Sequence, residues 1–298
     1  MNRAHGVRLD HPIFQGPLAV NVVLDKDHPY ADAHDGQGTW LVHEGEFGKG
    51  CDVGMVSDGH GFEDSPDCER ISGGINSKGP KAVAIGRQAN MLQWGFYGGP
   101  DRMTESGKRA FLNTIVYMKR FDGQVPLVKK ESQARSWYAQ YVDTLAHMKP
   151  EERADRGERS YAGYLLKQFP AELTADPVDV ERLRKWYADN EEYFGPGKDR
   201  YSTAIDADLA ALQLSNRKPE FLDWLLERFG KDPKDEQALR LAKRYLGEKN
   251  GADAATAKAW IESNRPFLFF SDSGGYCWFV DTNGKRAGKV VEASAGRK

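Results

Sequence analysis

The character of the sequence changes near residue 123, and this change constrains the fold more than any other feature. Residues 1–123 hold 19 of the 31 glycines and six of the seven histidines, with short apolar runs at 18–24 and 82–85 between turn-forming residues. Such a texture is typical of strands joined by long loops. Residues 130–264 instead repeat apolar and aromatic side chains every three or four positions among dense charges. That spacing places one apolar stripe on each of several helices.

Prolines and glycines mark the helix ends of the second part. Pro177 and Pro233 each follow an aspartate, which fits a capping residue and then proline at the first helical position. Gly230 and Gly247 fit the far ends, where a left-handed residue closes the last turn. The pattern predicts helices over 130–147, 151–168, 177–193, 203–214, 218–229, 233–246 and 253–263. These short helices with brief links predict a bundle or an irregular helical-repeat array.

Two aromatic runs follow the helices, at 266–270 and 276–280, with Gly274 and Gly275 between them. They predict a β-hairpin whose aromatic face packs on the helices, because an isolated hairpin is only marginally stable in water. We therefore expect three parts of the chain. They are an α/β domain over 1–123, a helical domain over 124–264, and an aromatic hairpin with a tail over 265–298.

Composition excludes several classes of protein. The 42 lysines and arginines against 44 aspartates and glutamates give a formal net charge of −2, which argues against a general nucleic-acid or acidic-membrane binder. The mean hydropathy of −0.66 and the absence of an apolar run of about 18 residues predict no membrane span. No export signal is visible at the N-terminus, so we expect a cytoplasmic protein.

An acidic loop over residues 57–69 gathers five carboxylates and one histidine. Close carboxylates on a glycine-rich loop can supply oxygen ligands to a hard cation, or an acid of raised pKa. The spacing lacks the alternating acids and the twelfth-position glutamate of a calcium loop. The candidate catalytic residues, as acid, base or metal ligand, are Asp58, His60, Glu63 and Asp64. A solvated acidic loop is the simpler interpretation.

Neither the histidines nor the three cysteines show the spacing of a metal site. Cys51 lies in a Gly-Cys-x-x-Gly order rather than the Gly-x-Cys-x-Gly order of a nucleophile elbow. Residues 72–80 have the glycines to wrap an anion with backbone amides. In that segment Lys78 precedes Gly79, whereas a Walker loop has the reverse order. We therefore expect no metal and no cofactor.

Polar and aromatic residues follow the predicted strand at 82–85. Functional residues of open α/β sheets gather at strand ends. Arg87, Gln88 and Asn90 are candidates for binding a hydroxyl-rich or carboxylate ligand, with Trp94 as a stacking face. An internal network that ties loops together is the simpler interpretation of the same residues.

The next helix is predicted to begin after Thr104, whose hydroxyl can cap it, with Glu105 adding negative charge at the N-terminus. We expect this helix to be scaffold. Its predicted packing face consists of Phe111, Leu112, Ile115, Val116 and Met118.

Several segments together resemble the C-terminal half of a trehalose-utilisation (ThuA-like) domain, a branch of the class I glutamine amidotransferase-like fold. The resemblance covers about residues 9–123. It rests on His11-Pro12-Ile13 with Gly16, the turn at 27–30, the strand ending at Gly86-Arg87, the Trp94-Gly95 pair and the helix from Thr104 to Tyr117. The segments at 71–80, 94–96 and 121–123 look especially like multidomain bacterial proteins of planctomycete type.

The resemblance implies a flavodoxin-like three-layer sandwich whose first strands would precede Met1, unless this branch of the family has a shortened sandwich. The expected fold is therefore α/β, a partial flavodoxin-like sandwich followed by an all-helical domain with a C-terminal β-hairpin. ThuA-like domains generally lack the amidotransferase Cys-His-Glu triad, and no motif here restores it.

The first functional hypothesis is a non-amidotransferase module in carbohydrate-linked binding or protein assembly. Its partner would be a sugar, a sugar acid or a protein, and neither a nucleic acid nor a membrane. One alternative is a hydrolase or isomerase that acts on sugar derivatives through the loop at 58–69. The other is a helical protein-interaction scaffold.

Overall fold

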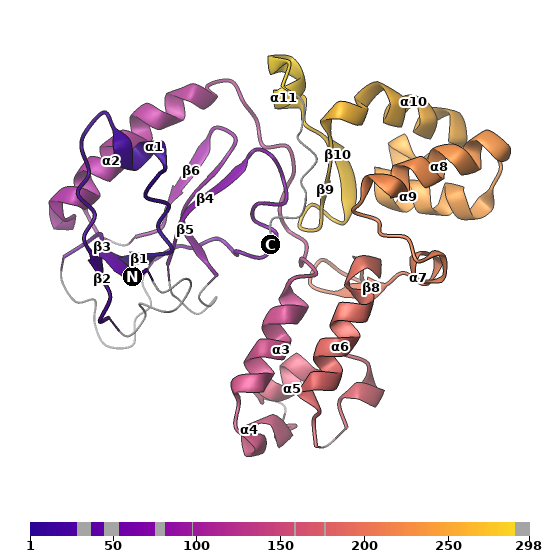
Figure 1. The fold of residues 1–298 in the computed structure, drawn as a ribbon, viewed down its shortest axis with the longest axis horizontal. Coiled ribbons are helices and arrows are strands. Elements are labelled where there is room, and N and C mark those ends of the chain that lie inside the picture. Colours follow the sequence, from indigo (N-terminus) through magenta and orange to yellow (C-terminus); the bar gives the residue numbers. More distant parts are fainter. Residues whose placement is uncertain are drawn as a thin grey trace. The chain divides into compact units, whose positions relative to one another are not determined.

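The computed structural model describes residues 1–28, 37–44, 54–74, 81–96, 98–157, 159–175 and 177–289. These residues form two compact units (Figure 1). The sheet unit holds the described residues of 1–129 and 281–289, and the helical unit those of 130–280. The mixed α/β class predicted from the sequence, with a helical region and a C-terminal hairpin, is confirmed. No helix in these ranges is long and apolar enough to cross a membrane.

Six strands of the sheet unit pair in one sheet. They are β1 (Arg3–His5), β2 (Leu24–Asp25), β3 (Thr39–Leu41), β4 (Cys68–Gly73), β5 (Val83–Gln88) and β6 (Met91–Trp94). Their order is β2-β3-β1-β4-β5-β6, and every pairing between these described strands is antiparallel. The strands of a flavodoxin-like sheet run parallel. The strand directions therefore differ from those that the ThuA-like resemblance implies.

The predicted strand at 82–85 opens β5, which lies buried between β4 and β6. A tight turn at Ala89 leads directly from β5 into β6, with a left-handed φ of +47°. Both polar groups of the Ala89 backbone are bonded: its N–H donates to the Asp67 carbonyl, and its own carbonyl accepts from Arg87. This turn fixes the end of β5 beside the start of β4.

Two helices, α1 (Pro12–Gln15) and α2 (Glu105–Met118), pack with the sheet in one hydrophobic core (Figure 1). The predicted cap of α2 is confirmed, since Thr104 Oγ1 accepts the Gly107 N–H at 3.1 Å. The fully buried Asn113 ties the two helices together. Its side-chain amide donates to the carbonyls of Ile13 and Leu18, both at 2.8 Å.

The packing face of α2 differs from the prediction. The residues buried against the sheet are small or polar, together with one tyrosine: Gly107, Ala110, Asn113, Thr114 and Tyr117. Leu112, Ile115 and Val116 are 49%, 56% and 53% exposed. The helix approaches the sheet so closely that a Cβ at Gly107 would lie 2.5 Å from the Val42 carbonyl oxygen. A side chain does not fit at Gly107, so the start of α2 turns its small residues to the core, and Leu112, Ile115 and Val116 point outward.

The helical unit contains most of the predicted helices. It consists of α3 (Trp137–His147), α4 (Pro150–Ala154), α5 (Tyr161–Leu166), α6 (Val180–Asn190), α7 (Ala207–Leu212), α8 (Pro219–Lys231), α9 (Glu236–Asn250) and α10 (Ala254–Asn264), with strands β7 (Phe194–Pro196), β8 (Thr203–Ile205), β9 (Leu268–Ser271) and β10 (Cys277–Val280). A short helix of the sheet unit, α11 (Thr282–Ala287), follows β10. Two predicted helices are corrected: residues 151–168 form two short helices, and 203–214 begins with β8, which pairs with β7.

The predicted helix ends are partly wrong. Helices α6 and α9 begin three residues after the prolines, because a second aspartate caps each one. Asp179 accepts the Arg182 N–H at 3.0 Å, and Asp235 accepts the Ala238 N–H at 2.9 Å. Gly230 lies inside α8, whereas Gly247 breaks the helical geometry of α9 with φ +82°.

The hairpin of β9 and β10 packs on the helices, as its aromatic residues predict. Tyr276 and Trp278 are 1% and 5% exposed and belong to the helical core. The Trp278 indole donates to the Asn216 carbonyl at 2.8 Å. The hairpin is therefore part of the helical unit.

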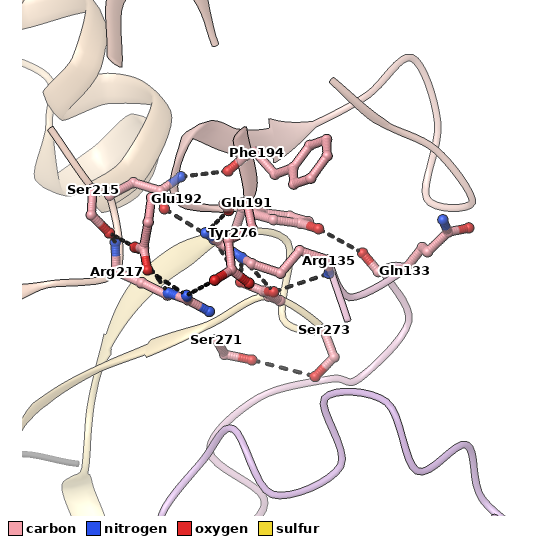
Figure 2. A network of polar contacts seen from close by, with 12 residues as sticks. Gln133, Arg135, Glu191, Glu192, Phe194, Ser215, Arg217, Ser271, Ser273 and Tyr276 are labelled. Atoms are coloured by element: carbon pink, nitrogen blue, oxygen red, sulfur yellow. Dashed lines mark hydrogen bonds and ion pairs between the residues drawn. The ribbon is translucent and has the colours of Figure 1, made fainter. Parts of the chain in front are cut away.

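A buried arginine joins the hairpin turn to the helices (Figure 2). Arg135 is 1% exposed, and its Nε lies 2.8 Å from an oxygen of Asp272 in the turn. Its other guanidinium nitrogens donate to the Glu191 carbonyl at 2.7 Å and to Asn216 Oδ1 at 3.0 Å. Because every nitrogen of this guanidinium has an internal acceptor, the network has a structural role.

Candidate functional site

Glu69 of β4 is the centre of a polar cluster in the sheet unit. Its carboxylate pairs with His11 Nε2 at 3.0 Å, with Arg87 Nε at 3.0 Å and with the Tyr117 hydroxyl at 2.7 Å. These partners come from the start of α1, from β5 and from α2. His11 Nδ1 accepts the Ile13 N–H, so the proton of this imidazole lies on Nε2 and points at Glu69. We call these four residues the Glu69 cluster.

The protonation states within the Glu69 cluster are fixed by its hydrogen bonds. Burial alone would raise the pKa of Glu69, but the hydrogen bonds from His11, Tyr117 and Arg87 outweigh it and lower this pKa to about 2. Burial and the neighbouring Glu69 carboxylate raise the pKa of Tyr117 to about 12. Near neutral pH Glu69 is therefore charged and Tyr117 protonated. Because neither group changes its protonation state near neutral pH, the cluster is suited to holding side chains in place and not to proton transfer.

Arg87 is held on both sides. It is 7% exposed, and beyond its ion pair with Glu69 it donates to the Ala89 carbonyl at 3.1 Å. Its guanidinium also lies 3.8 Å from the ring centroid of Phe121. These contacts connect the β5 turn, through Glu69, to the Tyr117 ring.

A cavity of about 490 Å³ opens beside Tyr117, between the loop after α1 and the end of α2. Its wall is formed by Pro12, Gly16, Pro17, Val116 and Tyr117. The backbone of Gly16 is extended, with φ 165°, and a Cβ built there meets no atom within 4 Å. The position of Gly16 in the cavity lining therefore has room for a side chain.

The lining of this cavity is mostly apolar, and its residues with polar side chains are Asp10, Gln15 and Arg120. Arg120 is exposed, and its guanidinium lies 5.2 Å from the Tyr117 ring centroid. Within the described ranges it forms no ion pair with a carboxylate. An exposed guanidinium stacked on an aromatic ring can accept a carboxylate or phosphate from solution.

The four predicted ligand residues do not converge on one surface. Arg87 is buried in the Glu69 cluster, and Gln88 donates to the Val128 carbonyl at 2.8 Å. Asn90 is exposed in the turn between β5 and β6. Trp94 packs edge-on against Phe111, with ring centroids 5.2 Å apart. Its buried indole N–H has no hydrogen-bond acceptor among the described residues.

Carboxylates of the predicted acidic loop accept backbone N–H groups, among them that of Leu127, which donates to Asp67 at 2.9 Å. Asp58 accepts the His60 N–H at 2.8 Å, and Glu63 accepts the Arg70 N–H at 3.1 Å. Burial and a nearby lysine lower the pKa of His60 to about 4, so its imidazole is neutral at pH 7. Asp64 is half-buried. In the ranges that the structure covers, no group of three histidines, cysteines or acids is arranged to hold a metal ion.

Two sequence-based candidates lie outside the described residues. They are Cys51 and most of the anion-loop segment, residues 75–80. Of the other cysteines, Cys68 Sγ accepts a hydrogen bond from the Ser65 hydroxyl at 3.3 Å, and burial raises the pKa of Cys277 to about 11. A thiol of this pKa is a weak nucleophile at neutral pH.

Sequence reasoning missed Glu69 as the centre of the cluster. It counted Glu69 only as one of five carboxylates of the acidic loop. Its partners lie 58, 48 and 18 residues away along the chain, so no local spacing connects them.

No protein-family model, curated protein or solved structure matches the chain. The geometry of the Glu69 cluster and of the adjoining cavity therefore carries the functional argument.

Proposed function

We propose that the chain is a binding protein whose sheet unit takes a small sugar acid in the cavity beside Tyr117. The observation that carries the proposal is that Arg120, an exposed cation next to the Tyr117 ring, is among the residues that line the cavity. The choice of a carbohydrate-type ligand comes from the sequence resemblance to ThuA-like domains, whose strand directions this sheet does not share.

The cavity offers complementary chemistry to each part of such a ligand. Arg120 can hold the carboxylate in a two-pronged ion pair. The Gln15 amide nitrogen already donates to the Leu9 carbonyl at 2.8 Å, so the oxygens of Gln15 and Asp10 are left for hydroxyl groups, while Pro12 and Tyr117 offer an apolar surface to the C–H face of the ring. The volume of about 490 Å³ lies within the usual range for small-ligand sites.

The Glu69 cluster favours binding over hydrolysis. Glycoside hydrolysis needs a carboxylic acid that is still protonated near neutral pH. Glu69 is ionised at that pH and already accepts three hydrogen bonds. In this proposal the cluster holds the Tyr117 ring in place as part of the cavity wall.

The proposal is tested by calorimetric titration of the full chain with glucuronate and galacturonate, and with glucose as the neutral comparison. We expect the uronates to bind at least tenfold more tightly than glucose. Arg120→Gln is expected to weaken uronate binding at least tenfold, because a charge-assisted hydrogen-bond pair is lost. Arg102→Gln, which removes an exposed arginine just before α2, is the matched control and should change nothing.

A second variant blocks the cavity. Gly16→Phe places a large side chain in open space without backbone strain, because φ 165° is accessible to any residue. We expect it to abolish uronate binding, whereas Gly16→Ala retains it. Uronate binding that survives both Arg120→Gln and Gly16→Phe, or no saturable binding at all, would refute the proposal. Turnover of a nitrophenyl glycoside that is lost in His60→Asn would instead favour the hydrolase alternative.

A further inference from the structure

The outward face of α2 is aliphatic where a helix on the surface of a sheet is normally polar. Leu112, Ile115 and Val116 are spaced three and four residues apart, so they lie side by side along the helix. Each is about half exposed, although the other face of α2 is buried in the core. Contiguous exposed aliphatic groups of this kind mark interaction surfaces.

Cations stand at both ends of this aliphatic face. Lys108 lies one turn before Leu112, while Lys119 and Arg120 follow Val116. Two other charges of the helix are already satisfied internally: Arg109 pairs with Glu105 at 2.8 Å, and Lys119 pairs with Asp122 at 3.1 Å. Lys108 and Arg120 form no ion pair with a described carboxylate. They are about 18 Å apart along the helix at 1.5 Å per residue.

This charge pattern argues against a second copy of the chain. In an antiparallel contact between two α2 helices, Lys108 of one copy would meet Arg120 of the other. In a parallel contact Lys108 would meet Lys108. Both arrangements place like charges together around the apolar centre, which is unfavourable in an interface.

The face fits a membrane surface less well than a protein. Membrane-surface helices carry broad apolar faces with tryptophan or phenylalanine that sink into the lipid. Here the outward face has three aliphatic side chains and no aromatic one, and the helix is held in the core by its opposite face.

We propose that the outward face of α2 binds an acidic amphipathic helix of another protein. The partner would place apolar side chains between Leu112, Ile115 and Val116, as packed helices do. Its carboxylates would stand about three turns apart, so that they reach Lys108 and Arg120 together. This inference shares Val116 and Arg120 with the sugar-acid proposal. It rests also on Lys108, Leu112 and Ile115, which do not line the cavity, so variants at these three positions test it separately.

The test uses a synthetic alanine-rich peptide of about five helical turns, with leucines on one face and glutamates at both ends of that face. The first comparison peptide carries lysines in place of the glutamates, and the second is a scrambled acidic peptide. Binding of each labelled peptide to the full chain is followed by fluorescence anisotropy at low and high ionic strength. We expect the acidic helix to bind at least tenfold more tightly than either comparison peptide, and salt to weaken that binding.

Three variants locate the binding site. Leu112→Glu is expected to weaken binding of the acidic peptide at least tenfold. Val23→Glu, an equal change at an aliphatic residue that is 70% exposed, should leave binding unchanged. Lys108→Glu is expected to weaken the acidic peptide and strengthen the lysine peptide, an exchange that a purely structural defect would not produce. Uronate binding should be unchanged in Leu112→Glu, so failure of one proposal is distinguishable from failure of the other.

Several results would overturn the inference. They are absence of acidic-peptide binding, equal binding of the acidic and lysine peptides, and binding unaffected by Leu112→Glu. Concentration-dependent self-association that Leu112→Glu removes would identify a second copy as the occupant. Attachment to anionic phospholipid vesicles that Leu112→Glu abolishes would identify a membrane.

Discussion

Each unit buries an arginine against a carboxylate, but the two pairs differ in what surrounds them. In the helical unit, Arg135 and Asp272 are 2% and 12% exposed at their side chains, and the remaining guanidinium nitrogens donate to interior acceptors. In the sheet unit, Arg87 and Glu69 are 9% and 18% exposed, and Glu69 also holds Tyr117 at a cavity wall.

The difference separates a network that maintains a fold from one that supports a site. All described hydrogen-bond partners of Arg135 lie in the interior of the helical unit, so removing Arg135 should affect stability alone. The Glu69 cluster includes Tyr117, whose ring lines the cavity. Loss of the cluster should therefore affect both stability and ligand binding.

The largest effect is expected for Arg135→Ala. Removing one partner of a buried ion pair leaves Asp272 buried and uncompensated, which costs about 3–5 kcal/mol. Urea unfolding and hydrogen exchange of residues 130–280 measure the loss. The control is Arg184→Ala, whose side chain is 46% exposed in a surface pair and should cost under about 1 kcal/mol. Equal effects of the two variants would remove the contrast between buried and exposed pairs.

The next effect is expected for Glu69→Gln. The folded-state pKa of Glu69, about 2, lies below the ordinary value of 4.5. The ionised Glu69 carboxylate therefore stabilises the folded state above pH 4.5, and this stabilisation is lost as the pH falls from 4.5 towards 2. A shift of this size corresponds to at most about 3 kcal/mol. Unfolding free energies at pH 6 and near pH 2.5 should show the wild type losing its advantage over Glu69→Gln in acid.

Glu63→Gln is the control for this pH dependence, since Glu63 is exposed and, among the described residues, accepts a hydrogen bond from the Arg70 N–H alone. Its difference from the wild type should stay under about 1 kcal/mol across the same range. If the unfolding free energy of Glu69→Gln fell in acid as much as that of the wild type, the Glu69 cluster would not be the source of this pH-dependent stability.

Tyr117→Phe sharpens the comparison within the cluster, because it keeps the ring and removes the hydroxyl. A hydrogen bond to a charged group contributes about 1.5–3 kcal/mol, so the loss is expected near the lower limit. In the background of Glu69→Gln the same change should cost less, since the two residues act through one contact. Additive effects in this double-mutant cycle, measured by urea unfolding, would contradict the coupling. Tyr161→Phe, at a ring 59% exposed, is the control.

The smallest effect is expected for Leu112→Glu. Because this residue lies on the outward face of α2, the change should alter the unfolding free energy by less than about 0.5 kcal/mol. Ala110→Glu, on the fully buried face of the same helix, should instead destabilise the sheet unit by several kcal/mol. A large loss of unfolding free energy in Leu112→Glu would show that Leu112 is buried in the core, as the sequence pattern predicts.

The sequence predicts the helical unit better than the sheet unit, for a physical reason. Helices such as α8 and α10 follow from apolar spacing and from a local start signal, Pro219 in α8 and the capping Asp253 in α10. The prediction failed at β8, where three residues pair with β7 and Asp206 begins α7 afterwards. A strand this short depends on its partner, and no local pattern reveals it.

The face of α2 shows a different limit. Hydrophobicity favours Leu112, Ile115 and Val116 for the core, yet the close approach at Gly107 and the bonds of Asn113 decide the orientation. The candidate site is likewise built from long-range contacts. Arg87 was among the predicted ligand residues, but its partner Glu69 and the Tyr117 ring meet it only in the folded sheet unit.

The account is tested most directly by hydrogen exchange of the full chain with and without saturating galacturonate. We expect added protection in the segments that line the cavity, residues 10–17 and 116–121, and none in residues 130–280. Protection confined to residues 130–280, or unchanged exchange throughout the chain, would contradict the assignment of ligand binding to the sheet unit.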